Sequence, residues 1–351
     1  MEAWISGIVE QLPIVLLFLI IAAAIAILVK GADLLVDQAV SLSVKWGVPK
    51  MLIGATIVSI GTTLPEAAVS VFAAVKGAPG LAMGNAVGSI IANTGLILGL
   101  AVIVGRVPVD PKLVSRQTWI QVSSAFLLVI VCIPFLSLNN IFIVGGRLPQ
   151  IVGAAFILLL CLYIWRSIAW SKSAPPDAVD DSTMSIHSDV KPIIAMLELI
   201  LGVAMVIVGS QILIPAVEET AIRLQIPNTI IAATLVAFGT SLPELVTAIT
   251  AVRRGHGELA IGNVLGANVL NVLFVSGAAA AVTRNGLDVP PQFFYLFFPS
   301  LMFVVIVLRV GIGRTSHELS KIFGIVLLLS YVITVILGFL VPESGGAAPS
   351  Q

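Results

Sequence analysis

Charged side chains are scarce in this sequence. They make up 10% of the 351 residues, whereas hydrophobic residues make up 58% and the mean hydropathy is +1.12. This balance excludes an ordinary soluble domain and predicts a protein whose main solvent is lipid. Runs of like charge are also missing and the formal net charge is zero, so the sequence gives no basis for binding nucleic acid.

Cysteine and histidine, the usual ligands of zinc and copper, are equally rare. The two cysteines, Cys132 and Cys161, each lie in an apolar stretch and are predicted to be buried free thiols rather than a disulfide. The three histidines, His187, His256 and His317, fall in predicted loops or at helix ends, so we interpret them as surface residues.

Apolar stretches long enough to cross a membrane, which takes about 20 residues, occur ten times. They centre on residues 12–36, 50–74, 80–104, 118–138, 150–170, 193–216, 227–251, 258–282, 292–312 and 320–341. No lysine or arginine precedes Lys30, so a cleavable signal peptide is not expected and the first stretch should remain as a helix. The sequence therefore predicts an all-α integral membrane protein with ten transmembrane helices.

The longest polar connection, residues 171–192, is rich in proline, serine and aspartate and is interpreted as a solvated linker. It separates a first five-helix unit, residues 1–170, from a second, residues 193–351. The aspartates of the linker lack the spacing of a calcium-binding loop.

Basic residues are distributed unevenly between the two ends of the predicted helices. With the N-terminus placed outside, the thirteen inner residues are Lys45, Lys50, Arg106, Lys112, Arg116, Arg166, Lys172, Lys191, Arg253, Arg254, Arg309, Arg314 and Lys321. The four outer ones are Lys76, Arg147, Arg223 and Arg284. Because loops rich in lysine and arginine stay in the cytoplasm, both termini are predicted to lie outside and the linker inside.

An internal repeat joins the two halves. At a constant shift of 178, residues 54–100 match residues 232–278 at 17 of 47 positions without a gap. The match aligns GTTLPE at 61–66 with GTSLPE at 239–244, and a weaker similarity pairs Gly31 with Gly209. Because five crossings are an odd number, the second copy enters the membrane from the opposite side. Inverted repeats of this kind are typical of secondary transporters.

Polar side chains gather on one stripe of the second predicted helix. Ser59, Thr62, Thr63 and Glu66 are spaced by three or four residues. Pro65 has no N–H, so the carbonyl of Gly61 loses its partner within the helix and is a candidate cation ligand.

The second repeat carries the same arrangement. Pro243 acts in the same way on the carbonyl of Gly239, and Thr240, Ser241 and Glu244 follow it closely. Two matched half-sites are therefore predicted to meet.

Asparagines mark a four-residue interval in the third and eighth predicted helices. The third contributes Asn85, Ser89 and Asn93; the eighth contributes Asn263, Ala267 and Asn271, with Asn268 as a further amide. Ligation by carboxylate, carbonyl, hydroxyl and amide oxygens suits hard cations such as Ca²⁺ and Na⁺ and disfavours zinc, copper and iron.

Two matched carboxylates at membrane depth need compensation, because each costs at least ~2.5–3.5 kcal/mol on insertion scales. Glu66 and Glu244 together balance one divalent cation, two monovalent cations or two protons. Competition for one shared site gives exchange, since an empty site with two unpaired charges is a poor state in which to change conformation.

With these motifs the chain resembles the cation/calcium exchanger superfamily, in particular the prokaryotic sodium/calcium exchangers. The resemblance runs from KGADLLV at 30–36 through both GT[TS]LPE motifs and their partner helices. It implies a transporter rather than an enzyme, no cofactor, and a location in a prokaryotic cytoplasmic membrane.

The resemblance also implies a set of ion ligands. Glu66 and Glu244 would be shared by calcium and sodium. The other family positions fall on Ser59, Thr62, Thr63, Ser89, Asn93, Ala237, Thr240, Ser241 and Asn271.

Two departures from the family pattern change the site. Asn271 stands where some relatives have an aspartate, and Ala267 stands where serine is common. The predicted site therefore has two acids rather than three, and one hydroxyl fewer.

Three functions stay open at this point. Sodium/calcium antiport by alternating access is the leading hypothesis, with calcium/proton antiport as its nearest rival and a passive cation channel as an alternative of another class. Membrane lipid is an expected partner, and the sequence leaves the oligomeric state open. Lys30, Asp33 and Asp37, near the inner end of the first helix, are interpreted as an ion pair within that helix, with a gating contact as the alternative.

Overall fold

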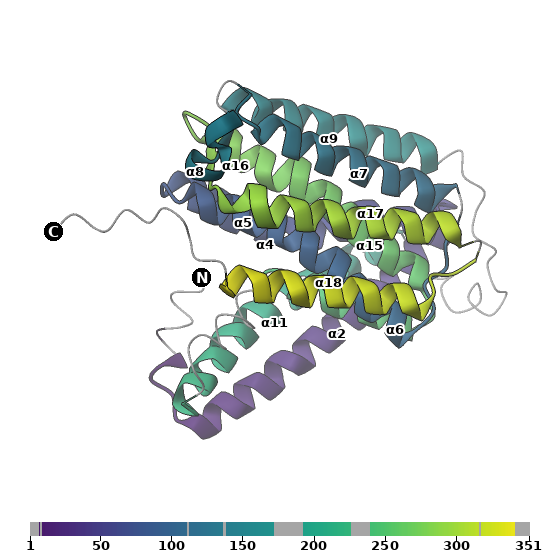
Figure 1. The fold of residues 1–351 in the computed structure, drawn as a ribbon. Helices are drawn as coiled ribbons and strands as arrows, with labels where there is room; N and C mark the ends of the chain where they lie inside the picture. Colours follow the sequence, from purple (N-terminus) through teal and green to yellow (C-terminus); the bar gives the residue numbers. More distant parts are fainter. Residues whose placement is uncertain are drawn as a thin grey trace.

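The computed structural model is a bundle of long helices (Figure 1). It describes residues 7, 9–110, 112–135, 138–171, 192–225, 239–315 and 317–340. Within these residues, nine helical segments are long and apolar enough to cross a membrane, and they coincide with nine of the ten predicted spans. The remaining span, predicted at 227–251, is described from Gly239 onward and contains helix α14 (Leu242–Arg253).

The helices of the first half follow the predicted spans closely. They are α2 (Ile14–Trp46), α3 (Lys50–Ile53) continuing through a π-helical stretch (Gly54–Val58) into α4 (Ser59–Val75), α5 (Pro79–Ile91) continuing through η2 (Ala92–Ile97) into α6 (Leu98–Val104), α7 (Leu113–Cys132), a short turn (Leu138–Asn140) with α8 (Ile141–Val144), and α9 (Gln150–Ser171).

The second half has the same order. It contains α11 (Pro192–Arg223), α14, α15 (Gly257–Leu270) continuing through η5 (Asn271–Ser276) into α16 (Gly277–Val282), a π-helical stretch (Phe293–Phe297) leading into α17 (Phe298–Arg314), and α18 (Lys321–Leu340). The outer faces expose large apolar side chains, for example Leu158 and Ile322 at 71% and 73%, as a lipid-facing surface requires. The all-α integral membrane fold is thus confirmed.

Helices α2 and α11 pack against each other and run obliquely to the other helices (Figure 1). Their lengths of 33 and 32 residues correspond to about 50 Å at 1.5 Å per residue, more than a bilayer core needs, and tilting accommodates the excess. Gly31 and Gly209, matched in the repeat, both lie in their interface. A Cβ at Gly31 would lie 2.7 Å from Met205 Cβ, so only glycine allows this approach.

The α3–α4 span touches α15 backbone to backbone. A Cβ on Gly54 would lie 2.4 Å from the carbonyl oxygen of Leu259, and one on Gly262 would lie 2.1 Å from that of Met51. These contacts bring the first motif helix against a polar helix of the second repeat.

Short backbone pairings join the two halves at both ends of the bundle. Strand β1 (Gly146–Leu148) pairs antiparallel with β2 (Leu287–Val289), and Arg147 forms an ion pair with Asp288 at 2.8 Å. Pro108 pairs with Glu318 in the same sense. Each pairing links a loop of one repeat with a loop of the other.

The cysteine prediction is half right. Both thiols are free, and Cys132 is buried, but Cys161 is exposed on α9. The prediction that both are buried was wrong for Cys161, because an apolar residue of a membrane helix can face lipid as well as the protein core.

Candidate cation-binding site

The two motif glutamates lie in the interior of the bundle, and both side chains are 0% exposed. Glu66 belongs to α4, with Pro65 inside the helix. Glu244 lies in the first turn of α14, which begins only at Leu242, because Ser241 has a non-helical backbone (φ −94°, ψ 9°). The first motif is therefore part of a continuous helix, whereas in the second Gly239 is helical, Thr240 and Ser241 form a turn, and α14 begins at Leu242.

Each glutamate is contacted by a hydroxyl of the opposite repeat. Thr63 donates to Oε1 of Glu244 at 3.4 Å, and Ser241, its matched residue, donates to Oε1 of Glu66 at 3.5 Å. Both contacts are long for O–H···O hydrogen bonds. They bring the two predicted half-sites together as a reciprocal pair.

The first hydroxyl of each motif reaches an asparagine of the opposite repeat. Thr240 donates to Oδ1 of Asn85 at 3.0 Å, and Thr62 contacts Oδ1 of Asn263 at 3.5 Å. Asn85 in turn donates to the backbone carbonyl of Glu66 at 3.1 Å. The sequence placed these asparagines on the polar helices, but their role in joining the repeats was not predicted.

Asn93 and Asn271 occupy matched positions where two α-helices change into π-helical stretches: η2 begins one residue before Asn93, and η5 begins at Asn271. A π-helical turn rotates the side chains that follow it and is often found at functional sites. Both residues are 0% exposed.

Several polar atoms at the site lack a hydrogen-bond partner among the described residues. They are Oε2 of Glu66 and of Glu244, and both side-chain atoms of Asn93 and Asn271. A buried carboxylate or amide oxygen without a donor is unfavourable, and a cation satisfies it.

The other predicted ligands are placed as follows. Ser59 is buried and donates to the carbonyl of Thr56 at 3.1 Å, and Ser89 is buried on α5. Gly61 lies on α4 against Val203 of α11, and Gly239 is two residues before Ser241. Ala237 lies outside the described residues, as does most of the linker.

The donor atoms of the candidate site indicate which cation fits it. Among the residues that the structure describes, no group of three or more histidine, cysteine, aspartate or glutamate side chains could hold a metal ion. A cation between Glu66 and Glu244 would thus be held by two carboxylates and by neutral amide, hydroxyl and carbonyl oxygens. Such a donor set fits Ca²⁺ or Na⁺.

A second buried polar group lies beside Asn93. Asn268 donates to the hydroxyl of Thr94 at 2.8 Å, and Gln121 of α7 donates to the same hydroxyl at 3.3 Å. The three side chains join helices of both repeats, and the connection was not predicted from the sequence.

The ion pair predicted within α2 is instead formed between helices. Arg254, which directly follows α14, contacts Asp33 at 2.8 Å and also pairs with Asp37, whereas Lys30 is exposed. The pKa of Arg254 is raised: partial burial lowers it, and the hydrogen bonds and charges of Asp37 and Asp33 outweigh that effect. The intrahelical interpretation was wrong because one guanidinium of the other repeat bridges both carboxylates, with one nitrogen on Asp33 and the other on Asp37.

Known proteins resemble the chain over nearly its whole length. Residues 16–169 and 194–340 each match the family described as sodium/calcium exchanger protein. A membrane protein of Methanocaldococcus jannaschii, MJ0091, described as uncharacterized, is 30% identical over 87% of this chain and 92% of its own length. The sodium/calcium exchanger MaX1 of Methanosarcina acetivorans is 28% identical over 92% of this chain and 98% of its own length.

The fold agrees with these matches. A solved structure of the sodium-calcium exchanger NCX_Mj, soaked with Na⁺, superimposes with a TM-score of 0.76 at 26% identity. The superposition covers 92% of this chain and 99% of the other.

Proposed function

The chain belongs to the sodium/calcium exchanger protein family, and from this premise we propose that it exchanges Ca²⁺ for Na⁺ across the membrane by alternating access at one site. Membership of the family makes the chain a cation-exchanging antiporter. The identity of the two ions and the residues that hold them are the proposal.

The reciprocal contacts of the motif hydroxyls carry this proposal. Thr63 and Ser241 each bind the Oε1 atom of the glutamate in the opposite repeat. The Oε2 atoms have no partner among the described residues. Because hydrogen bonds from each repeat hold the carboxylate of the other, the two carboxylates supply one shared set of oxygens rather than two separate sites.

The proposed ligands fall into three groups. Glu66 and Glu244 carry the charge, and the motif neighbours supply hydroxyl or backbone oxygens. Ser89, Asn93 and Asn271 come from the two polar helices. The full set is Ser59, Gly61, Thr62, Thr63, Glu66, Ser89, Asn93, Ala237, Gly239, Thr240, Ser241, Glu244 and Asn271.

Charge balance explains coupling. Two carboxylates match one Ca²⁺ or two Na⁺, so either load neutralises the site and lets it cross the membrane. A third Na⁺ would make the cycle electrogenic. Two protons would also neutralise the pair, which makes calcium/proton exchange the competing outcome.

We propose that residues 1–170 and 193–351 are the two repeats and that residues 171–192 form a cytoplasmic linker. Both termini then lie outside, in a prokaryotic cytoplasmic membrane. The uneven distribution of lysine and arginine supports this orientation.

Calcium flux in proteoliposomes tests the function. An outward Na⁺ gradient is expected to drive Ca²⁺ uptake against its own gradient, and a pH gradient without Na⁺ is expected to drive none. Uptake that followed the pH gradient and ignored Na⁺ would replace sodium by protons as the coupling ion. Ca²⁺ movement that only ever ran down its own gradient would identify a channel.

A further inference from the structure

Asp33 and Asp37 lie one helical turn apart on α2 and hold the same guanidinium. Arg254 contacts Asp33 at 2.8 Å and pairs with Asp37, and the three side chains are between 32% and 42% exposed. Because Arg254 directly follows α14, the contact ties α2 to the helix that carries Glu244.

The repeat does not reproduce this contact. A shift of 178 matches Arg254 with Lys76, Asp33 with Gln211 and Asp37 with Pro215. Lys76 therefore finds no carboxylate at the matched positions, and no ion pair of Lys76 occurs among the described residues. Among the residues that the structure describes, an ionic contact of this kind between α2 or α11 and the end of a motif helix therefore occurs only at Arg254.

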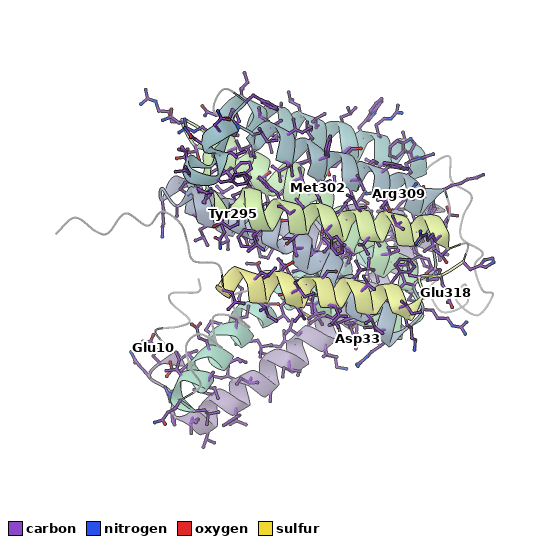
Figure 2. All side chains as sticks on the ribbon, viewed as in Figure 1. Glu10, Asp33, Tyr295, Met302, Arg309 and Glu318 are labelled. Atoms are coloured by element: carbon purple, nitrogen blue, oxygen red, sulfur yellow. The ribbon has the colours of Figure 1, made fainter. Side chains whose placement is uncertain are left out.

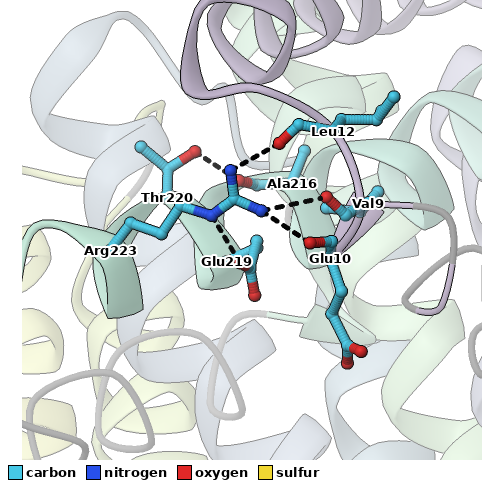
Figure 3. Close-up of polar contacts among 7 residues, drawn as sticks. All are labelled: Val9, Glu10, Leu12, Ala216, Glu219, Thr220 and Arg223. Atoms are coloured by element: carbon cyan, nitrogen blue, oxygen red, sulfur yellow. Dashed lines mark hydrogen bonds and ion pairs between the residues drawn. The ribbon is translucent and has the colours of Figure 1, made fainter.

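At the opposite end, α2 is tied to α11 rather than to α14. Arg223, in the last turn of α11, pairs with Glu219 at 2.6 Å and donates to the carbonyl of Glu10 at 2.8 Å and to that of Leu12, just before α2 begins (Figure 3). Together with the glycine contacts of Gly31 and Gly209, this makes α2 and α11 one unit. Figure 2 shows Glu10 and Asp33 towards opposite ends of the molecule.

A cavity of about 280 Å³ lies beside the ion pair, between α2 and α14. Its lining includes Val29, Asp33, Leu245, Ile249 and Arg253. Displacing α2 along α14 by one turn, about 5.4 Å, would separate Arg254 from its aspartates and change access to this cavity.

We propose that Arg254 is a positioning residue of exchange: with Asp33 and Asp37 it latches α2 to α14 at the end of the bundle where the linker attaches, and so favours the conformation closed at that end. The expected effect on transport rests on the exchange function proposed above. The latch itself, at one end of the bundle, is measured independently of transport.

Thiol labelling measures the latch directly. In a chain with Cys132→Ala and Cys161→Ala, Ile249→Cys places a reporter in the cavity, and a membrane-impermeant maleimide is added from the Arg254 side. Two partly exposed ion pairs shift a conformational equilibrium by roughly threefold to tenfold. Arg254→Gln is expected to raise the labelling rate by that factor.

Two further variants decide whether the ion pair is the cause. Arg314→Gln removes the same charge from the last turn of α17, outside the lining of the cavity, where the described residues form no ion pair, and should leave labelling unchanged. Asp37→Arg with Arg254→Asp reverses the pair and should restore low labelling. Equal labelling in the Arg254→Gln and unsubstituted chains, or an equal rise with Arg314→Gln, would refute the latch.

Transport shows the functional consequence. Arg254→Gln is expected to lower the apparent KM for Ca²⁺ at the Arg254 end and raise it at the opposite end, because it changes the population of each conformation and not the ligands. Equal KM changes at both ends would contradict the proposal. If labelling responds as expected while no variant exchanges Ca²⁺ for Na⁺, the latch stands and the proposed function falls.

Discussion

Thr63 of α4 donates a hydrogen bond to Oε1 of Glu244, at 3.4 Å, across the boundary between the two repeats. Its matched residue, Ser241, makes the same contact with Glu66. The motif hydroxyls therefore orient the carboxylate of the other half and not that of their own helix. Any motion that separates the halves must change both carboxylates together, which links the geometry of the site to the conformation of the protein.

Removing either carboxylate charge should stop exchange. Glu66→Gln and Glu244→Gln keep the shape of the side chain but lose about 3 kcal/mol of charged contact, which is roughly 100-fold in affinity. Both variants are expected to insert and fold while Na⁺-driven Ca²⁺ flux falls to the background of empty liposomes. Transport retained by either variant would rule out a shared site.

The reciprocal hydroxyl contacts predict that position 63 tolerates serine but not alanine. Thr63→Ser should be nearly neutral, because serine already makes the matched contact at position 241. Thr63→Ala should lower the apparent Ca²⁺ affinity about tenfold, as expected for the loss of a hydrogen bond to a charged group. Concentration-dependent flux measures both, and equal affinities of the serine and alanine variants would contradict this role of the hydroxyl.

The fold could be predicted from the sequence because the hydropathy of each stretch and the match between stretches 178 residues apart can both be read without knowing how the helices pack. Long apolar stretches fixed the spans, and the match of GTTLPE with GTSLPE identified the two acids. A match between two positions of the repeats does not show which side chains contact each other in the folded protein. Asn85 and Asn263 were seen as periodic amides, but their contacts with Thr240 and Thr62 depend on how the repeats pack.

The same limit explains the error at Asp33 and Asp37. Spacing along one helix favoured Lys30 as their partner, whereas Arg254 lies 217 residues from Asp37 in the sequence. Short-range rules cannot weigh a partner that only tertiary packing brings near. The π-helical stretches at Asn93 and Asn271 likewise have no counterpart in the hydropathy pattern.

Backbone contact between α3 and α15 should make Gly262 intolerant of a methyl group. Gly262→Ala would place Cβ 2.1 Å from the carbonyl oxygen of Met51, and relieving the overlap should destabilise the protein by about 1–3 kcal/mol. Gly338→Ala is the control, because its nearest side-chain atom, on Leu296, is 3.9 Å away. Thermal unfolding in detergent should show a lower midpoint for Gly262→Ala than for Gly338→Ala, and equal midpoints would refute the close contact.

A third acid at the site should make exchange sensitive to pH. Asn271→Asp adds a carboxylate where the described residues leave both amide atoms unpartnered, and a carboxylate beside two others takes up a proton that an amide cannot. We expect Ca²⁺ flux of the variant to fall between about pH 7 and pH 5 relative to the unsubstituted chain. Asn93→Asp, at the matched position of the first repeat, should behave in the same way. If both profiles coincide with that of the unsubstituted protein, the two asparagines lie outside the ion site and the π-helical stretches have another purpose.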